Sequence, residues 1–238
     1  GDNMGAALGL GLGRGDAAIS LGTSGTVFAV SATPTRDPSG AVAGFASATG
    51  DFLPHVCTLN ATKVTDTVAR WLGTDAAGLA ELALAAADEP GAVVLVPYFD
   101  GERTPNLPDA TGTFVGLTNE TTREQLALAA HDGVLCGLLA GLDALRSAGA
   151  AVDGRIFLVG GGGRSAAYRQ RLADLSGRAV VVPDTDETVA TGAAVQAAAV
   201  RTGEAFAEIA ERWSLGRGEQ LAPARNASAV RERYDASS

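Results

Sequence analysis

A run of four glycines, Gly160 to Gly163, is the feature that most constrains how this sequence can fold. The run follows an apolar, strand-like segment at residues 155–159 and precedes a predicted helix at residues 165–176. Glycine lets the backbone turn tightly and approach another group closely, and the first turn of a helix presents unpaired N–H groups. The pattern therefore predicts an α/β domain in which this turn either binds a phosphate-bearing ligand or is only a tight connection.

The other elements are predicted in an order of strands first, followed by alternating helices and strands. A short helix is expected at residues 2–12, with Asp2 as its N-cap. Further strands are expected at residues 17–21, 26–30, 45–48, 52–59, 93–96 and 179–182, and further helices at residues 62–72, 76–87, 122–148, 187–201 and 205–213. This order favours a mixed sheet flanked by helices. Residues 213–238 are polar, and we expect them to form a fraying tail.

The charge of the chain excludes some classes of partner. The net charge is −9 and no basic run occurs, so we expect no nucleic acid partner. Lys63 is the only lysine and does not follow a glycine-rich loop, so the Walker A motif is absent. A phosphate-bearing ligand would therefore need backbone N–H groups or a metal ion to offset its charge.

Apolar segments, cysteines and histidines indicate neither a membrane protein nor a metalloprotein. No apolar run approaches the length of a membrane span and no signal peptide opens the sequence, so we expect no membrane partner and a cytoplasmic location. Cys57 and Cys136 have apolar neighbours and are expected to be buried free thiols. His55 and His131 are isolated from cysteine and carboxylate clusters, so we expect both to be structural and predict no metal site.

Three further segments are candidates for chemistry. The turn Gly22-Thr23-Ser24-Gly25 lies between two predicted strands and can hold an anion through its N–H groups and hydroxyls, although a plain hairpin turn has the same composition. Asp2 is either a helix cap or a general base that accepts a proton from a substrate hydroxyl. Small residues at Gly192 to Ala194 predict that the helix at residues 187–201 packs closely near the glycine run.

Taken together, these segments resemble the FGGY carbohydrate kinases, and among them the xylulose kinases, from the first residue to about Arg201. The segments that carry the resemblance are Gly1-Asp2-Asn3, Ile19 to Thr26, Tyr98 to Pro105, Gly116 to Thr118, Gly160 to Ser165 with Tyr168, Arg169 and Gln170, and Glu187 to Ala194. Their order and spacing are similar to those of the second of the two domains in that family. The resemblance implies an α/β domain of the ribonuclease H-like, actin/hexokinase ATPase type over residues 1–212, with a mixed sheet flanked by helices.

The resemblance also implies roles for individual residues. Asp2 corresponds to the catalytic base, and Asn3 to a neighbour that contacts the sugar. Nucleotide-binding roles are implied for Gly22 and Thr23 at the phosphates, for Gly161, Gly162, Gly163, Ser165 and Ala166 at the adenosine, and for Gly101 in a segment that approaches the nucleotide. ATP and Mg²⁺ are the implied cofactors, and D-xylulose is the implied sugar substrate.

The first domain of that family, which carries an Asp-containing phosphate turn and most of the sugar contacts, has no counterpart here. The chain also begins with Gly1 and not with Met, so we expect a C-terminal half that is nearly inactive without its missing N-terminal kinase domain. A homodimer of the intact enzyme is a further implication. Two alternatives stay open: an FGGY kinase for glycerol, gluconate, ribulose or a deoxy-sugar, and a non-catalytic nucleotide-binding module of the actin-like superfamily.

Overall fold

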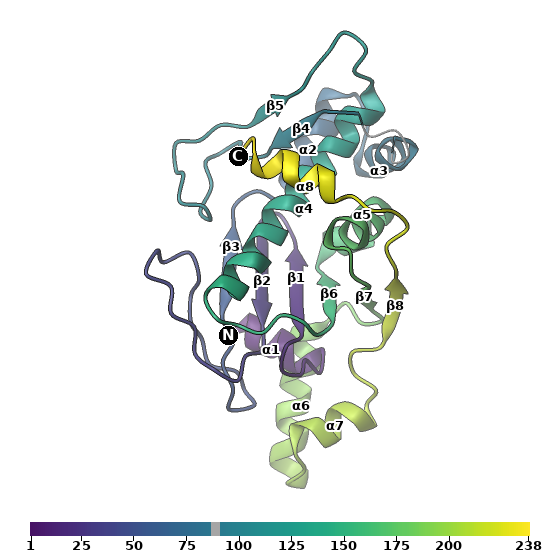
Figure 1. Ribbon diagram of the computed structural model, residues 1–238. Coiled ribbons are helices and arrows are strands. Elements are labelled where there is room, and N and C mark those ends of the chain that lie inside the picture. Colours follow the sequence, from purple (N-terminus) through teal and green to yellow (C-terminus); the bar gives the residue numbers. More distant parts are fainter. Residues whose placement is uncertain (87–90) are drawn as a thin grey trace.

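The computed structural model describes residues 1–86 and 91–238. A six-stranded sheet in the order β3-β2-β1-β6-β7-β8 forms its centre (Figure 1). These strands are β1 (Ala17–Leu21), β2 (Gly25–Ala29), β3 (His55–Thr58), β6 (Ile156–Val159), β7 (Val180–Pro183) and β8 (Gly218–Leu221). β1 pairs antiparallel with β2 and parallel with β6, so the sheet is mixed, as predicted. Because β1 and β6 are parallel neighbours, the turns that follow them lie at the same edge of the sheet.

Both faces of the sheet are buried. Ile19 and Leu21 of β1 belong to one apolar cluster, whereas Ala18 and Phe157 belong to another. The first cluster lies under helices α2 (Thr62–Trp71), α3 (Ala76–Ala85), α4 (Arg123–Ser147) and α5 (Ala166–Ser176), and the second under α1 (Asp2–Gly9). Successive side chains of a strand point to opposite faces, so a strand covered on both sides is apolar throughout.

Helix α4 is the core helix and crosses in front of the sheet in Figure 1. Thr122 caps it: the hydroxyl of Thr122 accepts a hydrogen bond from the N–H of Gln125, and the side chain of Gln125 accepts one from the N–H of Thr122. Contrary to our expectation, this helix is long and apolar enough to span a membrane by length and composition. Its most apolar stretch is, however, 78% buried inside the protein, which is the property of a core helix.

Helices α1 and α6 (Thr188–Thr202) cross at small residues. A Cβ atom added to Gly192 would lie 1.9 Å from the carbonyl oxygen of Gly5, and one added to Gly9 would lie 1.9 Å from that of Thr188. The two backbones can approach this closely only because the contact positions carry no side chain. The close packing predicted for α6 is therefore confirmed, but its main partner is α1 and not the glycine run.

Residues beyond 212 are folded, which corrects the predicted fraying tail. Helix α7 (Phe206–Arg212) is followed by β8, which pairs antiparallel with β7, and by α8 (Ser228–Asp235). Tyr234 of α8 is 2% exposed, and its hydroxyl donates a hydrogen bond to that of Tyr98 at 3.4 Å. β8 is an edge strand whose two central residues, Glu219 and Gln220, are polar and exposed, so it lacks the apolar pattern by which a strand is recognised.

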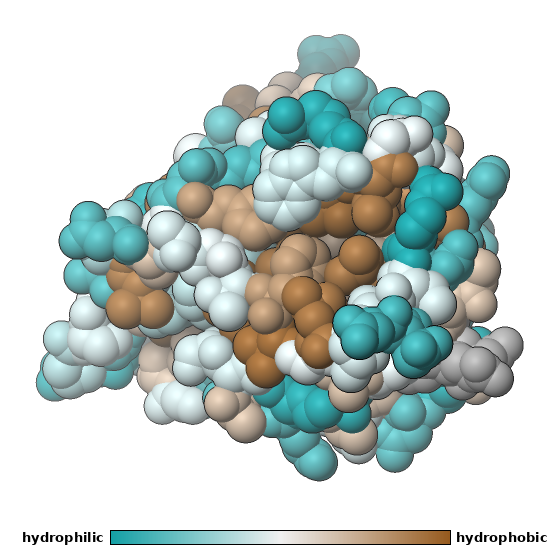
Figure 2. Space-filling model, turned by 90° about the horizontal axis from the view of Figure 1, so that it is seen from above, coloured by the Kyte–Doolittle hydropathy of each residue, from teal (hydrophilic) through white to brown (hydrophobic). Residues whose placement is uncertain are grey.

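The strands expected at residues 45–48 and 52–59 are only partly present. The first is replaced by a loop with isolated bridges, such as the one between Ala46 and Phe52, and the second is shortened to β3. A short strand that we did not predict, β5 (Thr113–Val115), pairs antiparallel with β4 (Val94–Val96). Together with α2 and α3, these two strands lie at the upper end of the molecule in Figure 1. Viewed from above, this end carries an apolar hollow surrounded by polar side chains (Figure 2).

Two helix ends also differ from expectation. Asp2 is the first residue of α1 and not its N-cap, because Gly1 holds that position and no side chain caps the helix. The helix predicted at residues 76–87 ends at Ala85, and Ala87 lies outside the described residues.

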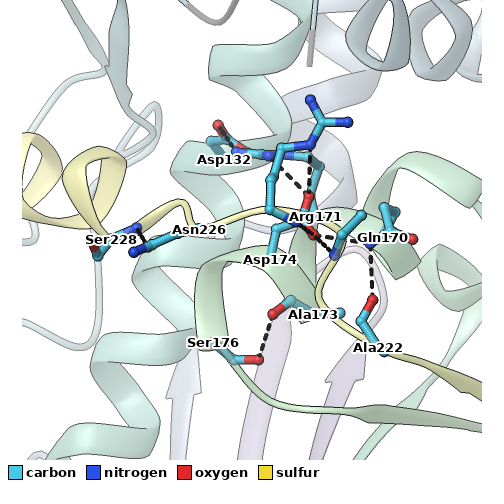
Figure 3. Close-up of polar contacts among 11 residues, drawn as sticks. Asp132, Gln170, Arg171, Ala173, Asp174, Ser176, Ala222, Asn226 and Ser228 are labelled. Atoms are coloured by element: carbon cyan, nitrogen blue, oxygen red, sulfur yellow. Dashed lines mark hydrogen bonds and ion pairs between the residues drawn. The ribbon is translucent and has the colours of Figure 1, made fainter. Parts of the chain in front are cut away.

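A buried polar cluster attaches the C-terminal segment to α4 and α5 (Figure 3). The Arg171 guanidinium donates two hydrogen bonds to the Asp132 carboxylate, at 2.8 and 2.9 Å, and one to Asp174 at 3.2 Å. Asp174 also accepts from the backbone N–H groups of Ala224 and Arg225, at 2.8 and 3.3 Å. All three charged side chains are almost fully buried, so this cluster fixes the final segment in place.

Candidate functional site

A pocket of about 710 Å³ lies where the turns after β1 and β6 meet helices α2 and α3. The β1–β2 turn contributes Gly22 and Thr23 to its lining. The connection between β6 and α5 contributes four of the predicted residues: Gly161, Gly162, Ser165 and Ala166. The carboxyl edge of parallel strands is the usual place for a ligand in α/β folds, and the volume is in the range of small-molecule sites.

Glycines bring the two turns together. Gly160 has a φ of +87°, and a Cβ atom there would lie 2.7 Å from the carbonyl oxygen of Leu21, the last residue of β1. A Cβ atom on Gly162 would lie 2.5 Å from Cγ of the same leucine. Nothing lies within 4 Å of a Cβ atom on Gly161. The run therefore packs tightly against β1 on one side and leaves open backbone facing the pocket on the other.

The start of α5 gives this wall of the pocket a positive character. The glycine run forms a short 3-10 helix, Gly161–Arg164, and Ser165 then caps α5 by accepting a hydrogen bond from the N–H of Tyr168. The first N–H groups of a helix have no partners within it, and the helix dipole places positive charge at this end. An anion beside Ala166 is therefore stabilised without any lysine.

Helices α2 and α3 form the opposite wall. The N–H of Thr62, the first residue of α2, donates to the carbonyl oxygen of Gly22 at 2.9 Å and so holds the β1–β2 turn. The lining from α3 is mostly small and apolar, with Ala76, Ala80 and Leu84. One wall thus offers backbone donors and the other offers apolar contacts, which suits a ligand with an anionic part and a flat apolar part.

Tyr168, Thr65 and His131 also line the pocket. The Tyr168 hydroxyl lies 3.0 Å from Oγ1 of Thr65, which in turn donates to the carbonyl oxygen of Thr62 at 2.9 Å. Burial raises the pKa of Tyr168 well above its usual value, so this phenol stays protonated. Burial lowers the pKa of His131 to about 4, so the imidazole is neutral at physiological pH.

Other predicted site residues lie outside this pocket. Gly163 is buried, and its carbonyl oxygen accepts a 2.5 Å hydrogen bond from Nε of Arg169. Gly101 lies in the loop after β4, where its carbonyl oxygen accepts from Nδ2 of Asn60 at 2.7 Å. Asp2 and Asn3 form the exposed and half-buried start of α1, and neither lines the pocket.

The pocket residues contributed by α2, α3 and α4 were missed in the sequence. Their periodicity is visible in retrospect, since Ala76, Ala80 and Leu84 recur at helical spacing on one face of α3. His131 was expected to be structural, and its burial agrees with that, but it also lines the pocket. No local signal shows that a core helix contributes to a pocket.

Metal-ligating side chains and free thiols are the remaining candidate reactive groups. Within residues 1–86 and 91–238, no group of three or more His, Cys, Asp or Glu side chains is placed to hold a metal ion. Asp66 and Glu81 are the only carboxylates among the lining residues described. Cys57 and Cys136 are free thiols, the first half-buried and the second buried.

Comparison with known proteins shows the family and the fold of this chain. Residues 17–200 match the model of the FGGY family of carbohydrate kinases, C-terminal domain. A xylulose kinase of Streptomyces coelicolor is 49% identical over 222 residues, which are 93% of this chain and 44% of that protein. The crystal structure of a xylulose kinase from Bifidobacterium adolescentis superposes with a TM-score of 0.86 at 45% identity, covering all of this chain and 46% of the other. A Plasmodium falciparum glycerol kinase, solved with ADP, has a TM-score of 0.86 at 17% identity over 100% of this chain and 49% of that one, which is a likeness of fold alone.

The fold is therefore the ribonuclease H-like domain of the actin/hexokinase type. The chain belongs to the FGGY family of carbohydrate kinases and corresponds to its C-terminal domain. It spans less than half the length of the curated relatives it matches.

Proposed function

We propose that this chain is the nucleotide-binding half of a kinase that transfers the γ-phosphate of ATP to the 5-hydroxyl of D-xylulose. The observation that carries the proposal is that two separate glycine turns, at Gly22 and at Gly161, line one pocket in a chain of this family. The sugar follows from the similarity to xylulose kinases over most of the chain. The product of this reaction is D-xylulose 5-phosphate.

In this proposal, ATP lies across the pocket. Its adenosine contacts the connection from Gly161 to Ala166, and its phosphates contact Gly22 and Thr23. Backbone N–H groups and the N-terminus of α5 stabilise the phosphate charge, which explains how an acidic domain without a Walker lysine binds a nucleotide. Gly163 lies behind this wall, where its carbonyl oxygen accepts a hydrogen bond from Arg169. Gly101 acts by positioning the loop after β4, which the hydrogen bond from Asn60 to its carbonyl oxygen holds in place.

Asp2 is the proposed general base. It would accept the proton of the sugar 5-hydroxyl as that oxygen attacks the γ-phosphorus, with Asn3 contacting the sugar beside it. The exposed position of Asp2 at the start of α1 leaves its carboxylate available to a substrate bound between this domain and another. Phosphoryl transfer needs little covalent chemistry from the protein, so positioning and charge stabilisation are its main contributions.

Mg²⁺ would accompany ATP, but residues 1–86 and 91–238 do not provide a metal site by themselves. The described residues include no cluster of three metal-ligating side chains. Magnesium binds proteins through few carboxylates and keeps phosphate and water ligands, so ATP and the missing half of the kinase would supply the remainder. A cytoplasmic location and a homodimer of the whole enzyme belong to the same proposal.

Nucleotide binding is tested by isothermal titration of this chain with ADP. We expect saturable binding with one nucleotide per chain, and weaker binding after Thr23→Ala. The matching control is Thr67→Ala, because Thr67 is a half-buried threonine of α2 that lies outside the pocket. Absence of any ADP binding to the folded chain would refute the nucleotide site.

Catalysis is tested in the full-length kinase. Asp2→Ala should lower kcat by roughly 10²–10⁴-fold, the usual contribution of a general base, while ADP affinity stays unchanged. Asp235→Ala is the control, since Asp235 is an exposed carboxylate at the end of α8. Near-normal turnover of the Asp2 variant would contradict the assignment of Asp2 as the general base. A panel of D-xylulose, gluconate, glycerol and ribulose then identifies the preferred acceptor.

A further inference from the structure

His131 presents an unused hydrogen-bond acceptor to the nucleotide pocket. Its side chain is 2% exposed, and its Nδ1 lies 2.9 Å from the carbonyl oxygen of Ala127, one turn earlier in α4. A carbonyl oxygen can only accept, so Nδ1 must carry the proton of the neutral ring. The other nitrogen, Nε2, is therefore an acceptor with a free lone pair.

The neighbouring hydroxyls cannot donate to Nε2. Thr65 spends its hydroxyl proton on the carbonyl oxygen of Thr62, so the Tyr168 hydroxyl must be the donor in its contact with Thr65. The Tyr168 ring itself packs against the imidazole at a tilt, with 4.6 Å between ring centroids. Across the described part of the chain, no hydrogen bond reaches Nε2. Nε2 is not among the fully buried atoms that lack a partner, and His131 lines the pocket, so a ligand there can donate to Nε2 and gain affinity.

The imidazole keeps this acceptor at physiological pH. Burial is the largest cause that lowers the pKa of His131, to about 4, and the nearby positive charge of Arg171 lowers it further, against the opposing effect of the Ala127 carbonyl. The ring is therefore neutral near pH 7, and Nε2 does not become a donor.

The rest of the pocket indicates what kind of group donates to His131. Apart from Glu81, the α3 wall is apolar, with Ala76, Ala77, Ala80 and Leu84, and so accommodates a flat ring. The β1–β2 turn, with Gly22 and Thr23, takes the charged end of the ligand. A flat ring with an amino group on its edge satisfies both the apolar wall and the Nε2 acceptor.

We infer that His131 determines which nucleotide base this pocket accepts, by taking a hydrogen bond at Nε2 from the exocyclic amino group of adenine. The inference rests on the proposed function, because it assumes that the pocket holds a nucleotide. Hypoxanthine presents a carbonyl oxygen where adenine presents its amino group, so inosine nucleotides place two acceptors against each other. Unsubstituted purine presents neither group and leaves Nε2 unpaired.

The first test compares three ligands on the unaltered 238-residue chain by isothermal titration: ADP, inosine diphosphate and purine riboside diphosphate. We expect ADP to bind roughly tenfold more tightly than purine riboside diphosphate, as befits one hydrogen bond to a buried group, and inosine diphosphate to bind most weakly. Equal affinity for all three would overturn the role of His131 while leaving the nucleotide site intact. If none of the three binds, the proposed function fails together with this inference.

Variants assign the preference to the residue. His131→Phe keeps a ring but has no acceptor. It should therefore no longer distinguish the two bases, and its ratio of ADP to inosine diphosphate affinity should fall to about one. His131→Gln carries an amide oxygen and should restore most of the preference. An unchanged ratio in His131→Phe would contradict the inference.

A spectroscopic readout does not depend on any variant folding. The chain has two histidines, and His55 lies outside the pocket, so it is an internal control. On addition of ADP, the ¹⁵N resonance of Nε2 of His131 should move in the direction of a hydrogen-bonded imidazole nitrogen, while the His55 resonances stay in place. The same experiment with purine riboside diphosphate should leave Nε2 of His131 unchanged, and an equal response to both ligands would overturn the assignment.

Discussion

Glu102 accepts a hydrogen bond from Nδ2 of Asn60 at 2.9 Å, and both side chains are almost completely buried. The same carboxylate accepts from the backbone N–H groups of Leu59 at 2.6 Å and Arg103 at 2.7 Å. It therefore joins the loop after β4 to the segment between β3 and α2. Two residues beyond Asn60, the N–H of Thr62 holds the carbonyl oxygen of Gly22 in the β1–β2 turn.

Removing this carboxylate should loosen the β1–β2 turn. Glu102→Ala removes the acceptor of three hydrogen bonds, and we expect it to lower the free energy of unfolding by about 1–3 kcal/mol. Hydrogen exchange at the Thr62 amide should quicken as well, because the segment that carries it loses its anchor. Glu120→Ala, at an exposed carboxylate, should change neither measurement. Unaltered exchange at Thr62 in the Glu102 variant would show that the turn is held independently of the loop.

Two adjacent glycines should respond differently to alanine. Gly162→Ala forces a methyl group to within 2.5 Å of the Leu21 side chain, and we expect it to cost about 1–3 kcal/mol of stability by overpacking. Gly161→Ala places its methyl group in open space and should leave the fold as stable as before. The same methyl group would, however, project into the proposed nucleotide pocket. Titration with ADP should therefore show weaker binding for Gly161→Ala. Equal unfolding midpoints for the two variants would disprove the packing part of this account.

The buried Arg171–Asp132 pair should matter far more than an exposed pair. Arg171→Met leaves Asp132 buried without its cation and leaves Asp174 with only Arg225, at 3.6 Å, so we expect a loss of about 3–5 kcal/mol in urea unfolding. Arg146→Ala removes an exposed pair with Asp143 and should cost less than about 1 kcal/mol. Adding Asp132→Leu to Arg171→Met should recover part of the loss, since it removes one uncompensated charge. No recovery in the double variant would point to a packing defect as the cause.

Stability should fall in acid partly because of His131. Its pKa is lowered from 6.5 to about 4 in the folded protein, so the unfolded chain takes up a proton first as the pH drops. Stability that is fully present above pH 6.5 is then lost as the pH falls to about 4, by roughly 3 kcal/mol for this group. His131→Phe cannot titrate, so its unfolding free energy should decline less over that window. Parallel declines in the two proteins, followed by urea unfolding at each pH, would contradict burial of a neutral imidazole.

Local features of the chain were predictable because they depend on neighbouring residues. The β1–β2 hairpin, the β6 strand with its glycine run, and helices α2, α4 and α5 follow from apolar periodicity and from the turn chemistry of glycine. The pocket residues Gly22, Thr23, Gly161, Gly162, Ser165 and Ala166 were predicted together through the resemblance to the FGGY kinases, whose motifs include both turns. All of the site assignments remain predictions, and Asp2, Asn3, Gly101 and Gly163 do not line the pocket.

What the sequence determined by itself is most of the strands and helices before residue 212, the places where the backbone must turn at glycine, and the family to which those motifs belong. Only the tertiary structure decided that His131 of a core helix reaches the pocket, that Glu102 anchors the segment before α2, and that the polar β8 completes the sheet. Hydrophobic periodicity and turn propensity act over a few residues. Contacts between distant segments arise from how whole elements pack, and a polar edge strand or a buried histidine carries no local signal of its partner.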